Sequence, residues 1–216
     1  RSLHRRTGRT TSPHLQQATE RIGIDGRPIS PRRYVDTYRE IIPYVEMVDQ
    51  SSDVPMSKFE VLTAMAFAAF AEAPVDVAVV ETGLGGTWDA TNVVDGQVAV
   101  ITPIGYDHMD YLGTDLAAIA GEKAGIIKRA PEALIPTDTV AVLAKQEPAA
   151  MDVLLRRAVE MDAAVAREDS EFAVLGRQIA IGGQVLRLQG LGGVYDDIFL
   201  PLHGEHQAHN AVLALA

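Results

Sequence analysis

Residues 77–92 read VAVVETGLGGTWDATN, a run of apolar residues that ends at a carboxylate and continues into glycines. This order is typical of a buried strand followed by a ligand-binding loop. The glycines match neither familiar phosphate motif. A G-x-G-x-x-G loop needs a third glycine where Trp88 stands, and the P-loop pattern G-x-x-x-x-G-K-[ST] occurs nowhere in the chain. Any ligand chemistry of this loop must therefore come from other side chains.

Glu81 is the first candidate, because it stands at the expected carboxyl end of the strand. Doubly wound sheets bind their ligands at that edge, and a carboxylate there suits a hard cation such as Mg²⁺. An alternative is that Glu81 caps a backbone turn while the glycines only let the chain turn sharply. This motif alone does not separate the two interpretations.

Composition narrows the class of protein. The chain has 216 residues, 47% of them apolar, a formal charge of −10 and no cysteine. The charge argues against a nucleic-acid surface, which needs clustered cations, and the absence of cysteine excludes disulfides and thiolate metal sites. No apolar run reaches the roughly 20 residues that span a bilayer, so we expect a cytoplasmic protein with no membrane partner.

Alternating helices and strands predict an α/β fold with a doubly wound, mostly parallel sheet. Strands that are apolar on both faces suit a parallel sheet covered by helices on each side. Ser57 and Glu60 form a capping box for the second helix, and Pro43 should kink or end the first. The expected strands cover residues 75–80, 98–104, 139–143 and 163–167, and the expected helices cover 31–42, 57–73, 114–127 and 148–161.

The two ends of the chain have a different pattern. Residues 1–8, RSLHRRTG, resemble the tail of a helix capped by Gly8. Short alternating strands with glycine turns over 172–202 predict an antiparallel lobe, at about 167–203, before a last helix. We expect one partial domain over 1–216. Because the chain begins without methionine and ends inside a helical pattern, we also expect a fragment of a longer protein.

Several other polar residues are candidates for chemistry. Asp107, His108 and Asp110 should follow the strand next to that of Glu81, although such a group is commonly a hydrogen-bonded loop. Lys123 lies between small residues on a helix and is either functional or an exposed partner of Glu122. Ser12 lies in an expected turn, where its hydroxyl could bond the backbone or reach a ligand. We do not take the histidines near the end as a metal cluster, because their spacing suits a polar helix face equally well: His203, His206 and His209.

Taken together, these segments resemble the folylpolyglutamate synthases, often bifunctional with dihydrofolate synthase, of the Mur ligase superfamily. The resemblance covers nearly all 216 residues. It rests on the following motifs in order: TSPHL (11–15) with ERI (20–22), SKFEVLTA (57–64), VETGLGGTWDATN (80–92), ITPIGYDHMDYLG (101–113), GEKAGIIKR (121–129) and GEHQAHNAVLALA (204–216).

The resemblance implies an ATP-dependent ligase with Mg²⁺ ions. In that family ATP phosphorylates the carboxylate of dihydropteroate or a folate, and the amine of L-glutamate attacks the acyl phosphate. Metal ions would neutralise the converging anionic oxygens in this acidic protein. The family also implies a Mur ligase-like ATPase domain and a monomeric parent.

The resemblance also assigns residues. Glu81 would hold one Mg²⁺, Ser12 and His108 would hold a second, and Lys123 would be carbamylated to position it. Gly85 and Gly86 would leave room for phosphates, and Asn210 would lie near the adenine. The pteroate site would be bordered by three residues: His14, Leu15 and Arg21.

Departures from the family pattern limit this assignment. The family's phosphate loop and C-terminal domain are not in this sequence, and Thr82 and Thr87 replace an apolar residue and an arginine. We therefore expect this chain alone to bind ATP poorly and make no product. The alternatives are another Mur-type amino-acid ligase, and a non-catalytic binding protein that has lost its P-loop.

Overall fold

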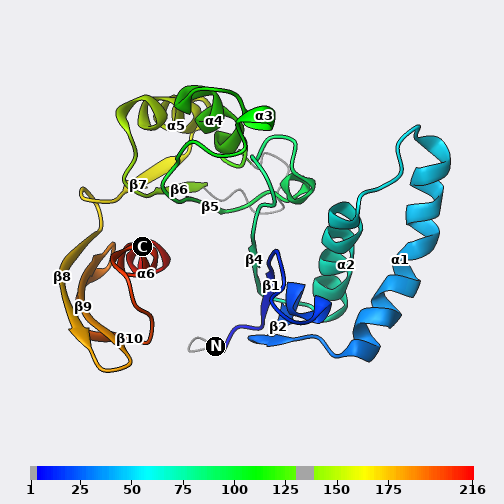
Figure 1. The fold of residues 1–216 in the computed structure, drawn as a ribbon, viewed down its shortest axis with the longest axis horizontal. Coiled ribbons are helices and arrows are strands. Elements are labelled where there is room, and N and C mark those ends of the chain that lie inside the picture. The colour runs from blue at the N-terminus through cyan, green and yellow to red at the C-terminus, as the bar shows by residue number, and fades with distance from the viewer. Residues whose placement is uncertain (1–3, 130–138) are drawn as a thin grey trace. The chain divides into compact units, whose positions relative to one another are not determined.

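The computed structural model describes residues 4–129 and 139–216, and it divides into two compact units, Arg1–Val93 and Val94–Ala216. Each unit is described by itself. Helices and strands are labelled in chain order (Figure 1). Within the described residues, no helix is both long enough and apolar enough to span a membrane.

The first unit is built on a four-stranded sheet in the order β3-β2-β1-β4. Strands β1 (Thr7–Thr10) and β4 (Val77–Val80) are parallel, while β1 pairs antiparallel with β2 (Ile22–Ile24), which pairs antiparallel with β3 (Arg27–Pro28). Two short 3₁₀ helices, η1 (Ala18–Arg21) and η2 (Ala90–Val93), lie in the loops. The parallel β1–β4 pair brings two distant loops to one edge.

Two helices provide the core of this unit, α1 (Pro31–Ser51) and α2 (Lys58–Glu72). Figure 1 shows them side by side. They bury Ile41, Val45, Met65 and Phe70 together with Ile22 from the sheet. The Ile41–Val45 spacing of four residues places both side chains on one helical face.

Pro43 does not end the first helix, as one form of the prediction had it, because α1 continues to Ser51. Proline has no N–H, so one hydrogen bond of the helix is missing. Pro43 is exposed, and Thr37, Ile41 and Val45 form one buried stripe that runs past it. Packing of this stripe stabilises the helix on both sides of the proline.

The predicted capping box of α2 is confirmed. The Glu60 N–H donates to Ser57 Oγ at 3.2 Å, and the Ser57 N–H donates to Glu60 Oε2 at 2.6 Å. Hydrogen bonds from the Ser57 side chain, and next from its backbone, lower the pKa of the Glu60 carboxyl from its ordinary value of 4.5. The ionised form of Glu60 is therefore the one that stabilises the start of α2.

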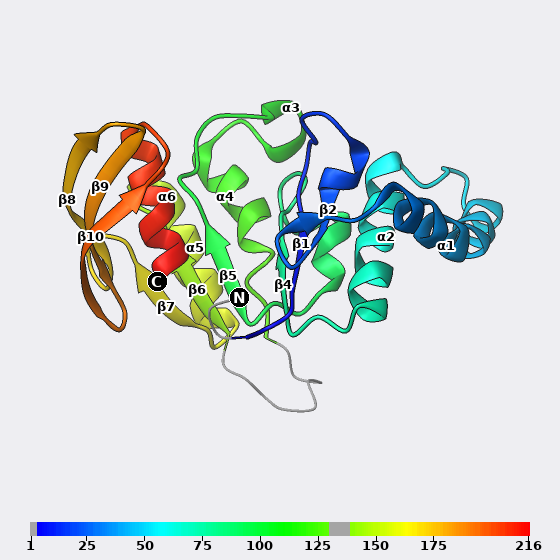
Figure 2. The same ribbon diagram turned by 90° about the horizontal axis from the view of Figure 1, so that it is seen from below.

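The second unit contains a parallel sheet in the order β5-β6-β7. Its strands are β5 (Val98–Ile101), β6 (Val140–Leu143) and β7 (Ala164–Arg167). Figure 2 shows them beside α4 (Leu116–Ala124) and α5 (Pro148–Glu160), with the single-turn α3 (Met109–Leu112) before α4. The shared core includes Ile101, Ile119, Leu143 and Leu154.

An antiparallel sheet follows, in the order β10-β9-β8, and the predicted lobe is confirmed. Its strands are β8 (Ala173–Ala180), β9 (Gly183–Gly190) and β10 (Gly193–Leu200), and the last helix is α6 (Glu205–Leu215). Leu186 and Leu188 of β9 pack with Phe172 and with Val212 of α6. The α/β class with a parallel sheet is likewise confirmed.

The expectation that β4 and β5 are neighbours stays a prediction, because the two strands belong to different units. Each is an edge strand of the hydrogen-bonded sheet of its own unit. Val79 and Val98, expected to be buried on both faces, are 60% and 56% exposed at these edges. Hydrophobic pattern identifies a strand but not its pairing partner, and an edge strand has one side without a neighbour.

The predicted helix tail over 1–8 is also wrong for its described part. Thr7 and Gly8 belong to β1, and residues 1–3 lie outside the described residues. Gly8 is not a helix cap. A Cβ at this position would lie 2.8 Å from the Phe70 ring, so glycine is there to let α2 approach the strand.

We predict that Ser57→Ala weakens the start of α2 by about 1 kcal/mol, which raises the exchange rate of the Glu60 amide about fivefold. Because the folded pKa of Glu60 is lowered, the carboxylate contributes fully above pH 4.5, and its contribution is lost as pH falls through the folded pKa. Hydrogen exchange measured by NMR at several pH values tests this. Glu60→Gln removes the carboxylate of the capping box, and Glu46→Gln on α1 is its control. Equal effects of these two variants on exchange at the start of α2 would contradict the prediction.

Candidate functional site

Glu81 follows β4 directly and lies against the residues that follow β1. In the parallel pair Thr10 is level with Val80, so Thr11 and Glu81 leave the sheet side by side. The Glu81 N–H donates to the Thr10 carbonyl at 3.2 Å. Glu81 Oε2 accepts from the Thr11 hydroxyl and, at 2.9 Å, from the Ser12 N–H.

This geometry bears on both interpretations of Glu81. Its Oε2 caps the turn at Thr11 and Ser12, which is the structural role. Its Oε1 accepts no hydrogen bond from the described residues, and Glu81 is exposed. One carboxylate oxygen is thus fixed by the protein while the other is available to a cation. Thr11 was missed from the sequence, because its contact with Glu81 depends on the parallel pairing.

The loop after Ser12 brings together the three residues predicted at a pteroate site. The Arg21 Nε–H donates to His14 Nδ1 at 2.9 Å. Since His14 Nδ1 accepts this bond, a neutral His14 carries its proton on Nε2. Leu15 is 93% exposed and is held through its backbone. The loop therefore presents one apolar side chain next to an arginine–histidine pair.

Glu20 organises this loop and was not predicted. Its two carboxylate oxygens accept from the N–H groups of Leu15 at 2.9 Å, Gln16 at 3.1 Å and Gln17 at 2.8 Å. The hydrogen bond from Leu15, followed by that from Gln17, lowers the pKa of the Glu20 carboxyl from 4.5. The Leu15 conformation is therefore set by a carboxylate–backbone cluster.

The glycine loop after Glu81 is closed by Asp89. Asp89 Oδ2 accepts from the Leu84 N–H at 2.8 Å, and Oδ1 accepts from the Thr91 N–H at 2.9 Å and the Thr91 hydroxyl at 2.5 Å. A Cβ on Gly83 would lie 2.5 Å from the Phe59 ring. The glycine at 83 thus serves packing, whereas Trp88 in the same loop is 89% exposed.

Gly85 and Gly86, predicted to leave room for phosphates, are both buried. Gly85 has a φ of 67°, which favours glycine, and the Gly86 carbonyl accepts from the Asp89 N–H at 3.2 Å. The positive φ explains the choice of glycine at position 85. Their contact with phosphate stays a prediction.

In the second unit, His108 lies beyond β5 and immediately before α3. The His108 N–H donates to Asp107 Oδ1 at 2.8 Å, and its Nε2 is 3.6 Å from Asp107 Oδ2. His108 has a φ of 52°, an uncommon value for a residue other than glycine. Asp110 lies in the single turn of α3. The local contacts are those of a hydrogen-bonded loop, and both side chains of the Asp107–His108 pair are mostly exposed.

Lys123 is half-buried in the last turn of α4. Its small neighbours differ in role: Ala124 is 2% exposed and belongs to the core, but a Cβ on Gly121 would meet no atom within 4 Å. The small residues beside Lys123 are therefore closely packed at Ala124 but not at Gly121. The chemical role of Lys123 stays a prediction.

Asn210 lies on an exposed face of α6, where its Nδ2 donates to Gln207 Oε1 at 3.4 Å. The preceding residue anchors the helix. His209 Nδ1 contacts Glu168 Oε1, and Glu168 Oε2 accepts from the Lys145 N–H at 2.9 Å. Lys145 and Glu168 lie just after β6 and β7, so one carboxylate whose side chain is 2% exposed joins α6 to the carboxyl edge of the parallel sheet.

The Glu168–His209 pair was not predicted, because 41 residues separate its members. Among the residues that the structure describes, no group of three or more His, Cys, Asp or Glu side chains is arranged to hold a metal ion. A magnesium site built partly from a hydroxyl or from phosphate oxygens would not form such a group.

We predict that Asp89→Ala loosens the glycine loop. The substitution removes the acceptor of three hydrogen bonds, so the steady-state fluorescence anisotropy of Trp88, the only tryptophan of the chain, should fall. Asp53→Ala, at an exposed loop position, is the control and should leave the anisotropy unchanged. Unchanged anisotropy in Asp89→Ala would mean that other contacts hold the loop.

We also predict that Glu168→Gln destabilises the packing of α6 by about 1 to 3 kcal/mol, because the buried side chain loses its charge and keeps only one of its two acceptor oxygens. Amide exchange along α6 measures this loss. Glu205→Gln is the matched control, since Glu205 Oε1 lies 4.0 Å from His209 Nε2 and its side chain is 78% exposed. Equal exchange rates in the two variants would be inconsistent with an anchoring role.

Comparison with known proteins agrees with the motifs. The family model described as the Mur ligase middle domain matches residues 52–216. The chain is 71% identical to the dihydrofolate synthase/folylpolyglutamate synthase of Mycobacterium tuberculosis over 100% of this chain and 45% of the relative. It is 39% identical to the corresponding protein of Bacillus subtilis, over 96% of this chain and 47% of the relative.

Solved structures show the same relationship. The Mycobacterium tuberculosis folylpolyglutamate synthase complexed with ADP and AMPPCP superposes with a TM-score of 0.93 at 73% identity, covering 99% of this chain and 48% of that one. A folylpolyglutamate synthase–AMPPCP–folate complex superposes with a TM-score of 0.89 at 32% identity, covering 98% and 50%. The resemblance inferred from the motifs is confirmed, and the chain spans about half the length of the relatives it matches.

Proposed function

The chain belongs to the Mur ligase middle-domain family, and from this premise we propose that it is the central part of an ATP-dependent ligase that joins L-glutamate to dihydropteroate or a folate. The observation that supports this most is the 71% identity to a dihydrofolate synthase/folylpolyglutamate synthase along the whole chain. The arrangement of Glu81 fits the same proposal, since one of its carboxylate oxygens is fixed and the other is available.

In the proposed reaction, a substrate carboxylate attacks the γ-phosphorus of ATP, ADP leaves, and an acyl phosphate forms. The amine of L-glutamate then attacks the acyl carbon, loses a proton, and expels inorganic phosphate to give an amide. Mg²⁺ would supply positive charge to the phosphate oxygens. Glu81 suits a metal ligand because its Oε1 accepts no hydrogen bond from the described residues.

We assign the remaining roles as follows. The Ser12 hydroxyl, in the first unit, and the His108 imidazole, in the second, are metal ligands. Lys123 acts as a carbamate. Asn210, on an exposed and anchored helix face, hydrogen-bonds the adenine. The backbone at Gly85 and Gly86 leaves space for phosphates.

The loop over 11–21 is assigned to the pteroate. Leu15 supplies an apolar contact for an aromatic ring, and the Arg21–His14 pair supplies donors for its polar edge. Glu20 holds the loop in this conformation through the N–H groups of Leu15, Gln16 and Gln17. A pre-ordered loop reduces the entropy lost on binding.

A chimera tests the proposal. Residues 1–216 replace the matching segment of the Mycobacterium tuberculosis enzyme, to which they are 71% identical, and glutamate ligation that depends on ATP is assayed. We expect an active chimera, and a loss of kcat of about 100-fold or more in Glu81→Gln. Glu46→Gln, on an exposed position of α1, should retain activity.

The alternative functions correspond to other outcomes. A folded chimera with no activity would favour a non-catalytic binding protein, and activity on a different acceptor would favour another Mur-type ligase. For the 216-residue chain by itself we expect no ligation and weak binding of Mg²⁺–ATP, because the sequence contains no P-loop motif. Isothermal titration with Mg²⁺–ATP, with Glu81→Ala as the comparison, measures this.

A further inference from the structure

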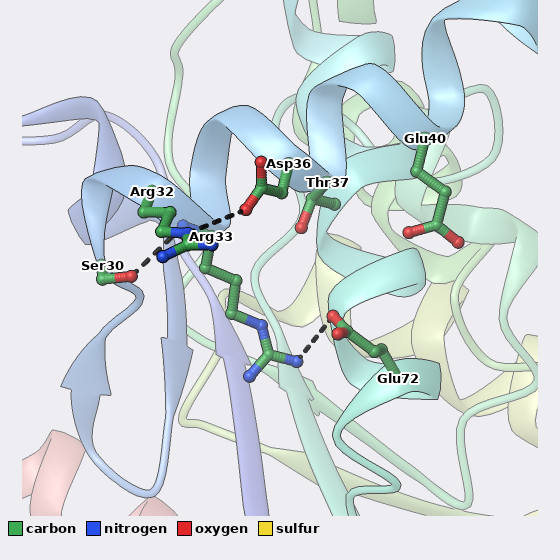
Figure 3. Close-up of a pocket in the computed structure, with 7 residues that line it drawn as sticks. All are labelled: Ser30, Arg32, Arg33, Asp36, Thr37, Glu40 and Glu72. Carbon is green, nitrogen blue, oxygen red and sulfur yellow. Dashed lines mark hydrogen bonds and ion pairs between the residues drawn. The ribbon is translucent and has the colours of Figure 1, made fainter.

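A small cavity lies between the N-terminal half of α1 and the C-terminal end of α2, with a volume of about 250 Å³. Figure 3 shows its lining. Six lining residues come from α1 and its cap, namely Ser30, Arg32, Arg33, Asp36, Thr37 and Glu40, and α2 contributes Glu72. The cavity is far from the glycine loop, because Phe59, which contacts Gly83, lies about 20 Å along α2 from Glu72.

Two buried polar atoms at this cavity have no hydrogen-bond partner within the described part of the chain: Arg33 Nε and Thr37 Oγ1. Thr37 is 2% exposed. Figure 3 shows its hydroxyl oxygen pointing toward the side of Arg33 and Glu72. Buried polar groups are nearly always satisfied, so these two atoms, four residues apart on α1, have hydrogen-bonding capacity that the described residues do not use.

The cavity is lined by charges of both signs. Arg32 and Arg33 lie in the first turn of α1, whose N-terminus adds positive potential. Asp36 is paired with Arg32, and Glu72, in the last turn of α2, is paired with Arg33. The remaining carboxylate of the lining is Glu40.

The ion pairs leave specific groups available. Arg33 Nη2 donates to the Ala69 carbonyl at 3.3 Å and to Glu72 Oε2 at 2.9 Å, which fixes the guanidinium between the helices but does not use Nε. Asp36 is 3.6 Å from both Arg32 and Arg39. Glu40 has no ion pair among the described residues, so its carboxylate is the free anion of the cavity.

We propose that this cavity binds a small zwitterion of the α-amino acid class with an uncharged side chain. The ligand carboxylate accepts from Arg33 Nε and the Thr37 hydroxyl, and its ammonium group donates to Glu40 and Glu72. Because Arg33 Nε and Thr37 Oγ1 are both buried, binding requires the guanidinium to move out of its contacts with the Ala69 carbonyl and Glu72. The Arg33 side chain is 32% exposed. An acidic side chain is disfavoured, because the five charged lining residues carry two positive and three negative charges. This site is independent of the ligase function proposed above.

The test is isothermal titration of the 216-residue chain with L-serine up to about 50 mM, far above the roughly millimolar dissociation constant of so small a ligand. We expect saturable binding of L-serine and none of sodium acetate or methylammonium chloride, which each carry one of its charges. Glu40→Gln should weaken binding about tenfold or more, and Thr37→Val about fivefold to tenfold. Glu46→Gln, the same charge change outside the cavity, should leave the affinity unchanged.

Three results would overturn the proposal: no binding of L-serine, equal binding of acetate or methylammonium, or equal weakening by Glu46→Gln and Glu40→Gln. Thermal unfolding of each variant establishes that it folds. If Thr37→Val unfolds, the exposed Glu40→Gln decides the outcome alone.

Discussion

The first unit depends on how closely α2 can approach the sheet and the glycine loop, and two glycines set that approach. A Cβ on Gly8 of β1 would lie 2.8 Å from Phe70, and a Cβ on Gly83 would lie 2.5 Å from Phe59. The two aromatic rings therefore fix both ends of one helix, one against a strand and the other against the loop that follows Glu81. Because Phe70 also belongs to the core shared with α1, the position of the loop is tied to the main hydrophobic cluster of this unit.

Carboxylates organise the loops throughout this acidic chain, and this explains why an acidic residue alone is weak evidence for catalysis. Glu20 accepts from three backbone N–H groups, Asp89 closes the glycine loop, and Glu168 joins three segments of the second unit. Each uses both of its oxygens. Glu81 differs because, among the described residues, only its Oε2 accepts hydrogen bonds, and both donors belong to Thr11 and Ser12, which follow the neighbouring strand β1. The distinction between a structural and a metal-binding carboxylate is thus one of remaining acceptor capacity.

Local sequence signals predicted local structure well. Ser57 and Glu60 identified the start of α2, and alternating residues with glycine turns identified the antiparallel lobe, because both patterns are read within a few residues. What failed depended on distant partners. Gly8 is needed because of its contact with Phe70. Thr11 and Glu81 meet although they are 70 residues apart in the sequence. The Glu168–His209 pair depends on the packing of α6. A single sequence carries no record of such pairings.

The family resemblance supplied what periodicity could not, since it named Glu81, Ser12 and Lys123 together although no local pattern links them. The structure adds a direct contact between two of these residues, because the Ser12 N–H donates a hydrogen bond to Glu81. This contact uses the backbone N–H of Ser12 and Oε2 of Glu81. It therefore uses neither the Ser12 hydroxyl nor the second carboxylate oxygen of Glu81. A carboxylate that positions a neighbouring hydroxyl through the backbone, and keeps one oxygen available, is suited to a hard cation that needs several oxygen ligands at once. In a protein of net charge −10, such a cation would also offset the repulsion of the anionic nucleotide in the function proposed above.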